Sequence, residues 1–291
     1  MRRFRSTRVL AMSLGVIAAF AAAGLTACEP PVPDTYVALG DSYTAGPLIL
    51  DQSTDPLGCL RSTKNYPSIA RTKIKAAKFK DVSCSGATTT HFFNEQGVTP
   101  GPNQPQFNSL NANTKVVTIG IGGNDIGFSG IVKNCATLDP FSAGCKGDYV
   151  TGGHDLLAEK IAATAPKIDQ VLVEAKKRAP GAKIFVVGYP TIIPETGSGC
   201  WPTVPIVAGD IAYLRGVAKG LNTMLKTRAQ ANGVHYVDTA TSSIGHDMCS
   251  SSKWVEAIVP TTDAAPVHPN AKGMANTGNV VAAAINAVVT A

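Results

Sequence analysis

Five short, apolar or β-branched segments alternate along this chain with longer amphipathic ones. The short segments predict strands at Tyr36–Leu39, Lys80–Ser83, Val116–Ile119, Lys183–Val187 and Val234–Val237. The longer segments predict helices at Pro67–Ala77, Leu156–Arg178, Ile211–Ala231 and Gly273–Thr290. Strands that alternate with helices are typical of a parallel sheet covered on both faces. The sequence therefore predicts an α/β fold, in which ligands bind at the carboxyl ends of the strands.

The beginning of the chain has the pattern of an export signal. Met1–Arg8 contain four arginines and no acidic residue, and an apolar run from Val9 to Ala27 follows. This run is long enough for an uncleaved membrane anchor. However, Leu25-Thr26-Ala27-Cys28 resembles the lipobox of bacterial lipoproteins, in which the cysteine is lipidated and becomes the first residue. We therefore expect a signal peptide over residues 1–27 and membrane association through a lipidated Cys28, with a plainly secreted protein as the alternative.

The remainder of the chain has the length of one domain. Residues 28–35 contain the segment Glu29-Pro30-Pro31-Val32-Pro33, which predicts a stiff spacer because proline excludes helix and central strand. Residues 36–291 can bury one substantial core, and we expect a monomer. Without the four arginines of the signal, 22 basic residues face 20 acidic ones. This near-neutral balance, without a basic cluster and interleaved aromatics, gives no reason to expect nucleic-acid binding.

The cysteines point to disulfides. Of the seven in the chain, setting aside Cys28 leaves six, and an even set in an exported chain is typical of a disulfide framework. Six cysteines allow about 15 connectivities. Pairing neighbours closes the smallest loops, so we expect Cys59–Cys84, Cys135–Cys145 and Cys200–Cys249. Zinc is the alternative, but the chain has no Cys-x-x-Cys spacing and no histidine pair at ligand spacing, so we expect no metal.

Four polar or glycine-containing turns lie where reactive groups are expected. Ser42 follows the strand Tyr36–Leu39, Gly86 follows the second strand, and Asn124 follows the third. His268 precedes the final helix. Each is unremarkable alone, because turns are rich in these residue types. Three of them directly follow predicted strands, so they are expected at one edge of the sheet, with Ser42 as an exposed nucleophile and Gly86 and Asn124 offering N–H groups to a ligand.

Two long connections remain, over residues 94–114 and 190–209. Both exceed the usual length of a connection in a compact domain. They are expected either to form walls of a pocket or to be surface loops tied by disulfides, and the sequence leaves both alternatives open.

With these turns the chain resembles the SGNH (GDSL-type) hydrolase family, in its disulfide-bonded branch of secreted bacterial lipases and esterases. The matching blocks are Gly40-Asp41-Ser42, Gly86, Gly122-Gly123-Asn124-Asp125 and the block that holds His268. The resemblance implies a three-layer α/β/α flavodoxin-like domain that hydrolyses carboxylic esters without a cofactor. It implies that Ser42 is the nucleophile and His268 the general base and acid. The Ser42 N–H, the Gly86 N–H and the Asn124 side-chain amide would form the oxyanion hole.

One position departs from the family pattern. The family usually carries an aspartate three residues before the histidine, and here that position is Ala265. We expect the Ala265 backbone carbonyl to orient His268, which would make a Ser–His dyad. Asp263 and Asp247 are the alternatives.

The expected function is thus that of an extracytoplasmic serine esterase or lipase whose partner is an ester or lipid substrate. Two other functions remain open at this point. One is a carbohydrate acetylesterase on the same scaffold, and the other is a surface lipoprotein that binds its ligand and has lost catalysis. The presence of Ser42, Gly86, Asn124 and His268 together argues against the second.

Overall fold

The computed structural model describes Met1 and residues 35–289. The expected signal peptide, Cys28 and nearly all of the proline-containing spacer lie outside the described residues. None of the helices in residues 35–289 is both long and apolar enough to cross a membrane.

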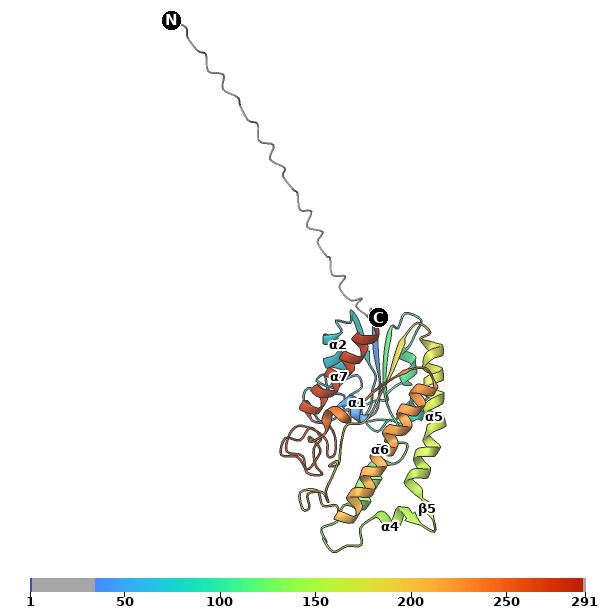
Figure 1. The fold of residues 1–291 in the computed structure, drawn as a ribbon. Coiled ribbons are helices and arrows are strands. Elements are labelled where there is room, and N and C mark those ends of the chain that lie inside the picture. Colours follow the sequence, from blue (N-terminus) through green and yellow to red (C-terminus); the bar gives the residue numbers. More distant parts are fainter. Residues whose placement is uncertain (2–34, 290–291) are drawn as a thin grey trace. The chain divides into compact units, whose positions relative to one another are not determined.

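The centre of the domain is a five-stranded sheet in which every strand pair is parallel (Figure 1). Its strands are β1 (Thr35–Gly40), β2 (Lys78–Asp81), β3 (Val116–Gly120), β6 (Lys183–Val187) and β7 (His235–Val237). They lie in the order β2-β1-β3-β6-β7. This is the order of flavodoxin-like doubly wound sheets. The predicted fold class is confirmed.

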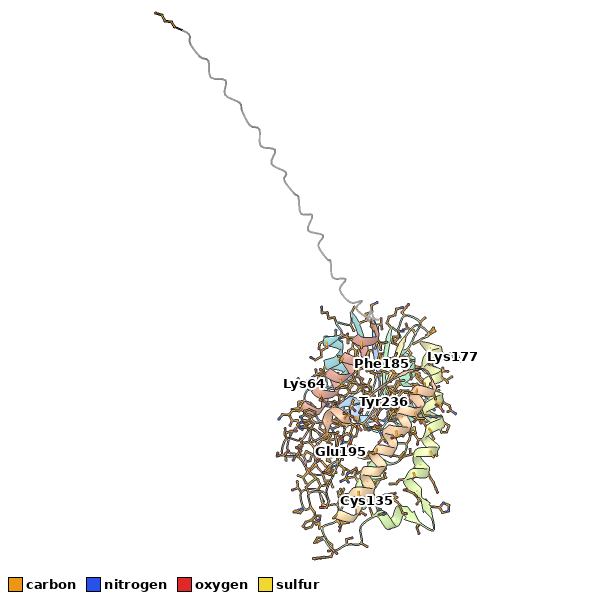
Figure 2. The ribbon with its side chains drawn as sticks, viewed as in Figure 1. Lys64, Cys135, Lys177, Phe185, Glu195 and Tyr236 are labelled. Carbon is orange, nitrogen blue, oxygen red and sulfur yellow. A yellow bond between two sulfur atoms is a disulfide. The ribbon has the colours of Figure 1, made fainter. Side chains whose placement is uncertain are left out.

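Helices cover both faces of this sheet (Figure 1). Alternate residues of a strand point to opposite faces, so Val37 and Leu39 of β1 belong to one core cluster and Tyr36 and Ala38 to another. The first cluster includes side chains of α3 (Phe128–Cys135), α5 (Leu156–Arg178) and α6 (Ala208–Ala231). The second includes Phe185, labelled in Figure 2, and side chains of α2 (Tyr66–Lys73) and α7 (Ala271–Val289).

Short elements complete the described chain. They are the helices α1 (Ser42–Ala45) and α4 (Lys146–Tyr149) and a small antiparallel hairpin of β4 (Val150–Thr151) and β5 (His154–Asp155). Four 3-10 turns lie at Leu57–Cys59, Thr89–Phe92, Gln106–Ser109 and Thr241–Ser243. None of these elements was expected from the sequence, because each is too short to show a periodic pattern.

The predicted strands and helices are present, with one clear shift. The structure forms β2 at Lys78–Asp81, whereas the sequence predicts a strand at Lys80–Ser83. β2 ends at Asp81 because the Asp81 carboxylate accepts hydrogen bonds from the backbone N–H and the hydroxyl of Ser83, at 2.9 and 2.7 Å. This local turn competes with the ladder for the backbone. α2 also ends earlier than predicted, at Lys73.

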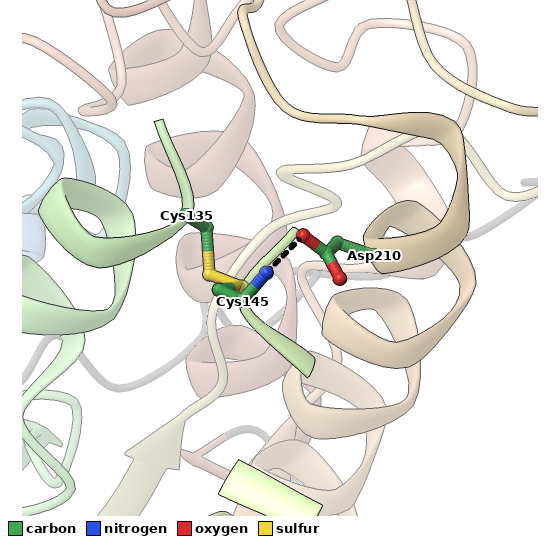
Figure 3. A group of neighbouring side chains, drawn as sticks. All are labelled: Cys135, Cys145 and Asp210. Atoms are coloured by element: carbon green, nitrogen blue, oxygen red, sulfur yellow. Dashed lines mark hydrogen bonds between the residues drawn. A yellow bond between two sulfur atoms is a disulfide. The ribbon is translucent and has the colours of Figure 1, made fainter. Parts of the chain in front are cut away.

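The structure joins the six cysteines of the domain in neighbouring pairs. The disulfides are Cys59–Cys84, Cys135–Cys145 and Cys200–Cys249. Asp210 lies beside the second of them, and its carboxylate accepts a hydrogen bond from the backbone N–H of Cys145 at 2.7 Å (Figure 3). The same carboxylate accepts from the backbone N–H of Lys146 at 3.0 Å. The two sulfur atoms are bonded to each other, so they are not free to ligate a metal as thiolates. Asp210 instead fixes the loop that follows α3.

Candidate active site

Ser42 lies at the point where β1 turns into the short helix α1. Asp41 caps this helix, and its Oδ1 accepts a hydrogen bond from the backbone N–H of Tyr43 at 2.9 Å. The Asp41 N–H donates to the carbonyl of Gly120 at the end of β3. The turn is therefore tied to two adjacent strands. It holds Ser42, a residue that is 7% exposed, at the wall of a cavity.

His268 faces Ser42 from the loop before α7. Its Nε2 lies 2.8 Å from Ser42 Oγ, and its Nδ1 lies 2.7 Å from the carbonyl oxygen of Pro266. A carbonyl can only accept, so Nδ1 carries a proton and Nε2 presents its lone pair to the serine hydroxyl. Burial lowers the pKa of His268, and the hydrogen bond to the Pro266 carbonyl partly opposes this effect. The imidazole is consequently neutral near pH 7, the form in which it can take a proton.

The acceptor of the His268 ring is Pro266, so the expectation of the Ala265 carbonyl was wrong by one residue. The Ala265 carbonyl instead accepts from the backbone N–H of His268 at 3.2 Å, closing a turn. Val267 has a left-handed backbone, with φ 58°, within this turn. That unusual conformation brings the Pro266 carbonyl to the ring.

The two carboxylates named as alternatives lie elsewhere. Asp263 is exposed at the surface. Asp247 is buried, but its Oδ1 accepts from the backbone N–H of Cys249 at 2.9 Å and so supports the loop near the third disulfide. In the described chain, the hydrogen-bond acceptor at His268 Nδ1 is thus a backbone carbonyl.

Gly86 and Asn124 line the same cavity as Ser42 and His268. Gly86 has φ 79°, a left-handed conformation that glycine adopts without strain. Asn124 Nδ2 donates to the Ala87 carbonyl at 2.9 Å, which leaves its second N–H for a ligand. The two loops are tied once more, since Asp125 accepts from the backbone N–H and the hydroxyl of Thr89 at 3.0 and 2.6 Å. The four residues that the sequence singled out therefore line one cavity: Ser42, Gly86, Asn124 and His268.

The cavity beside Ser42 has a volume of about 300 Å³ and is mainly apolar. Its apolar wall comes from α3, from α6 and from the long connection after β6; among the residues that form it are Ile131, Val132, Ile192, Ile193, Ile206, Leu214, Val217 and Leu221. Leu221 lies near the Asn124 loop, because a Cβ placed on Gly122 would be 3.7 Å from Leu221 Cδ1. Leu214 is two helical turns from Leu221, or about 10 Å along α6. The cavity therefore extends well beyond the serine.

Of the two long connections, residues 190–209 supply part of this wall. No cavity-lining residue comes from residues 94–114 of the described chain. That segment instead carries Gln106, whose side-chain amide makes two hydrogen bonds with the backbone of Gly40, at 2.8 and 2.9 Å. These hydrogen bonds hold the carboxyl end of β1 in place.

Sequence reasoning missed two tyrosines of the site. The Tyr43 ring lies 5.0 Å from the His268 ring, and its hydroxyl donates to the carbonyl of Val267 at 2.6 Å. Tyr189 lines the cavity, and its ring lies 5.1 Å from that of Tyr43. Both follow the carboxyl ends of strands, β1 and β6, and this position is the signal that could have found them.

A model of the GDSL-like lipase/acylhydrolase family matches residues 38–275, a range that contains all the site residues described above. This chain belongs to that family. It is accordingly a GDSL-like ester hydrolase, as the resemblance in its sequence predicted.

Individual relatives agree with this membership. The GDSL-like hydrolase is 37% identical over 284 residues to Lipase 2 of Streptomyces coelicolor, covering 94% of this chain and 93% of that protein. Its structure is similar to that of phospholipase A1 from Streptomyces albidoflavus NA297, with a TM-score of 0.73, 28% identity and coverage of 87% and 99% of the two chains. An extracellular lipase from Streptomyces rimosus is similar with a TM-score of 0.67, 27% identity and the same coverage.

Proposed function

We propose that this GDSL-like hydrolase is an exported serine esterase or lipase that cleaves esters of medium or long acyl chains through an acyl-enzyme on Ser42. The observation that carries the proposal is the 2.8 Å contact between Ser42 Oγ and His268 Nε2 at the wall of an apolar cavity. A serine needs a base to become nucleophilic, and His268 is held in the tautomer that can serve.

In the proposed reaction, Ser42 Oγ attacks the ester carbonyl carbon while His268 Nε2 takes the hydroxyl proton. The negative charge that forms on the carbonyl oxygen is stabilised by the N–H groups of Ser42 and Gly86 and by the Asn124 amide. The carbon–oxygen bond to the alcohol then breaks, and His268 gives its proton to the leaving oxygen. A water attacks the acyl-enzyme in the same manner, releasing the carboxylic acid and restoring Ser42.

The Pro266 carbonyl takes the place that a carboxylate has in a catalytic triad. It fixes the His268 ring through Nδ1 at 2.7 Å but supplies no full negative charge to the imidazolium that forms. The site therefore works as a Ser–His dyad with a backbone acceptor.

The cavity favours a lipase or long-chain esterase over a carbohydrate acetylesterase. An acetyl group would leave most of the wall formed by α3 and α6 without contact. An extended acyl chain would instead bury its methylenes there, at about 0.8 kcal/mol for each one removed from water. The proposed preference for medium or long acyl chains is inferred from the length of this apolar wall.

The test is hydrolysis of p-nitrophenyl esters from acetate to palmitate by the wild type beside Ser42→Ala. We expect kcat/KM to rise with acyl length over the first part of the series, and Ser42→Ala to abolish turnover. A maximum at acetate would favour the acetylesterase. Failure of a fluorophosphonate to label Ser42 in folded protein would favour a silent binding protein.

The proposed location is outside the cytoplasm. The three disulfides support this, since such bonds persist in oxidising compartments. The proposed organisation is a signal peptide over residues 1–27, a lipidated Cys28 with its spacer to residue 35, and a hydrolase domain over residues 36–291. Expression in a bacterial host, with wild type and Cys28→Ala compared for membrane association and incorporation of labelled palmitate, tests the anchor.

A further inference from the structure

Tyr189 occupies a rigid position between the two loops that carry Ser42 and Asn124. It follows β6 directly after Gly188, and the residue is 6% exposed. Its backbone is held from both sides by one residue of α6, because the Tyr189 N–H donates to Asn222 Oδ1 and Asn222 Nδ2 donates to the Tyr189 carbonyl, each at 2.8 Å. The phenol is thus anchored to the sheet and to a long helix.

The Tyr189 hydroxyl makes two hydrogen bonds in opposite senses. It donates to Asp41 Oδ2 at 2.5 Å and accepts from the backbone N–H of Gly123 at 2.7 Å. Asp41 immediately precedes Ser42, and Gly123 immediately precedes Asn124. One oxygen atom therefore sets the spacing between the serine turn and the loop that carries the side-chain amide of the oxyanion hole.

The packing around this oxygen leaves little freedom. A Cβ on Gly123 would lie 3.0 Å from the Tyr189 hydroxyl oxygen, so any larger residue there would push the phenol from its position. The other oxygen of the Asp41 carboxylate is already used by the Tyr43 N–H. Burial raises the pKa of Asp41 to about 7, which the hydrogen bond from Tyr189 partly offsets. Tyr189 is thus a main support of this buried carboxylate.

We propose that Tyr189 is a positioning residue that holds the Asn124 amide at the distance from Ser42 at which it stabilises the oxyanion. The inference rests on the proposed function of Ser42 and Asn124 and adds a role that acts through both. Preorganised donors are effective only when they are fixed before the charge develops. Loss of the Tyr189 hydroxyl removes the hydrogen bond that fixes the Gly123 N–H, while Asn124 keeps its hydrogen bond to the Ala87 carbonyl. None of the groups proposed to contact the ester carbonyl is deleted.

The test is Tyr189→Phe, compared with Tyr36→Phe as a matched control. Both substitutions remove one buried phenolic hydroxyl, and that of Tyr36 bonds to Thr118 Oγ1 at 2.9 Å within the other core cluster. We expect Tyr189→Phe to lower kcat about 10- to 10²-fold with little change in KM, since a displaced donor costs less than a deleted one. We expect Tyr36→Phe to keep the wild-type kcat even where its melting temperature falls.

A double-mutant cycle separates positioning from general stability. In an Asn124→Ala background the amide is gone, so Tyr189→Phe should produce little further loss of kcat. An equal loss in both backgrounds, or wild-type kcat in Tyr189→Phe, would overturn the inference while the wild-type rate still supports the proposed function. Absence of ester hydrolysis by the wild type would overturn both. If Tyr189→Phe does not fold, Asp41→Asn alters the same contact and is judged by the same cycle.

Discussion

His268 Nδ1 lies 2.7 Å from the carbonyl oxygen of Pro266, two residues earlier in the chain. This contact ties the orientation of the ring to the conformation of its own loop. The loop is held in turn by its neighbours: the Glu256 N–H donates to the His268 carbonyl at 2.9 Å, and Asn270 Nδ2 donates to Glu256 Oε1 at 2.8 Å. A fixed turn can therefore do the orienting work that a carboxylate does in a triad.

The first prediction follows from this arrangement. Asp263→Asn should retain a kcat close to that of the wild type, because the exposed Asp263 carboxylate is not the acceptor of the His268 ring. Steady-state kinetics on a soluble short-chain ester measure this, with Ser42→Ala as the inactive reference. Loss of a triad aspartate lowers kcat by about 10⁴-fold. A fall of that size in Asp263→Asn would rule out the dyad.

The second prediction concerns Asn124. Asn124→Ala should lower kcat about 10²- to 10³-fold, the usual effect of losing one oxyanion donor. The fold should persist, because the side chain is only partly buried and makes one hydrogen bond, to the Ala87 carbonyl. Asn94→Ala, at an exposed asparagine that also donates to a backbone carbonyl, is the control and should not change kcat. A wild-type kcat in Asn124→Ala would show that Asn124 does not contribute to the oxyanion hole.

Much of the fold was predictable because β1, β3 and β6 are buried on both faces and are therefore apolar almost throughout. The edge strand β2 was displaced by two residues for the opposite reason. The strand Lys78-Phe79-Lys80-Asp81 alternates in exposure and has one apolar residue. The buried, apolar Val82 lies just after it, and this shifted the predicted strand toward the carboxyl end of the chain.

The site was predictable only in part. Ser42 and His268 are separated by 226 positions, yet each follows a strand or precedes a helix at the same edge of the sheet. The Pro266 carbonyl, and not that of Ala265, accepts from the His268 ring because Val267 has a left-handed backbone. A valine rarely adopts this conformation, so the sequence could not predict it. The contact of Tyr189 with Asp41 joins residues 148 positions apart through side chains alone, and no local pattern encodes it.

The third prediction is a pH profile. Burial lowers the pKa of His268, and its neutral form is the base, so kcat/KM should rise with pH and reach half its plateau below the ordinary histidine value of about 6.5. Rates measured from pH 4 to 8 on an uncharged ester give this midpoint. A midpoint above about 6.5 would contradict the lowered pKa of His268.

The fourth prediction concerns stability and Asp41. Burial raises the pKa of Asp41 to about 7 in the folded protein, so between its unfolded value near 3.8 and pH 7 the native state binds more protons than the unfolded one. The stability contributed by this group is therefore complete at low pH and is lost as pH rises through the folded pKa. Asp41→Asn mimics the neutral carboxyl. The free energy of unfolding, measured by urea denaturation, should therefore fall from pH 4 to 7 more for the wild type than for Asp41→Asn. If the two proteins show the same pH dependence, the pKa of Asp41 is not raised.

The last prediction concerns acyl length. Leu214 lines the cavity about 10 Å along α6 from Leu221, so we expect its side chain to contact the distal part of a long acyl chain. Leu214→Trp should lower kcat/KM for palmitate esters at least 10-fold and leave acetate and butyrate esters nearly unchanged, because a bulkier side chain blocks only the far end. Leu138→Trp, at a leucine that is 88% exposed, makes the same change outside the cavity and should leave the whole ester series unchanged. Equal loss at every chain length in Leu214→Trp would mean that the acyl chain does not follow α6.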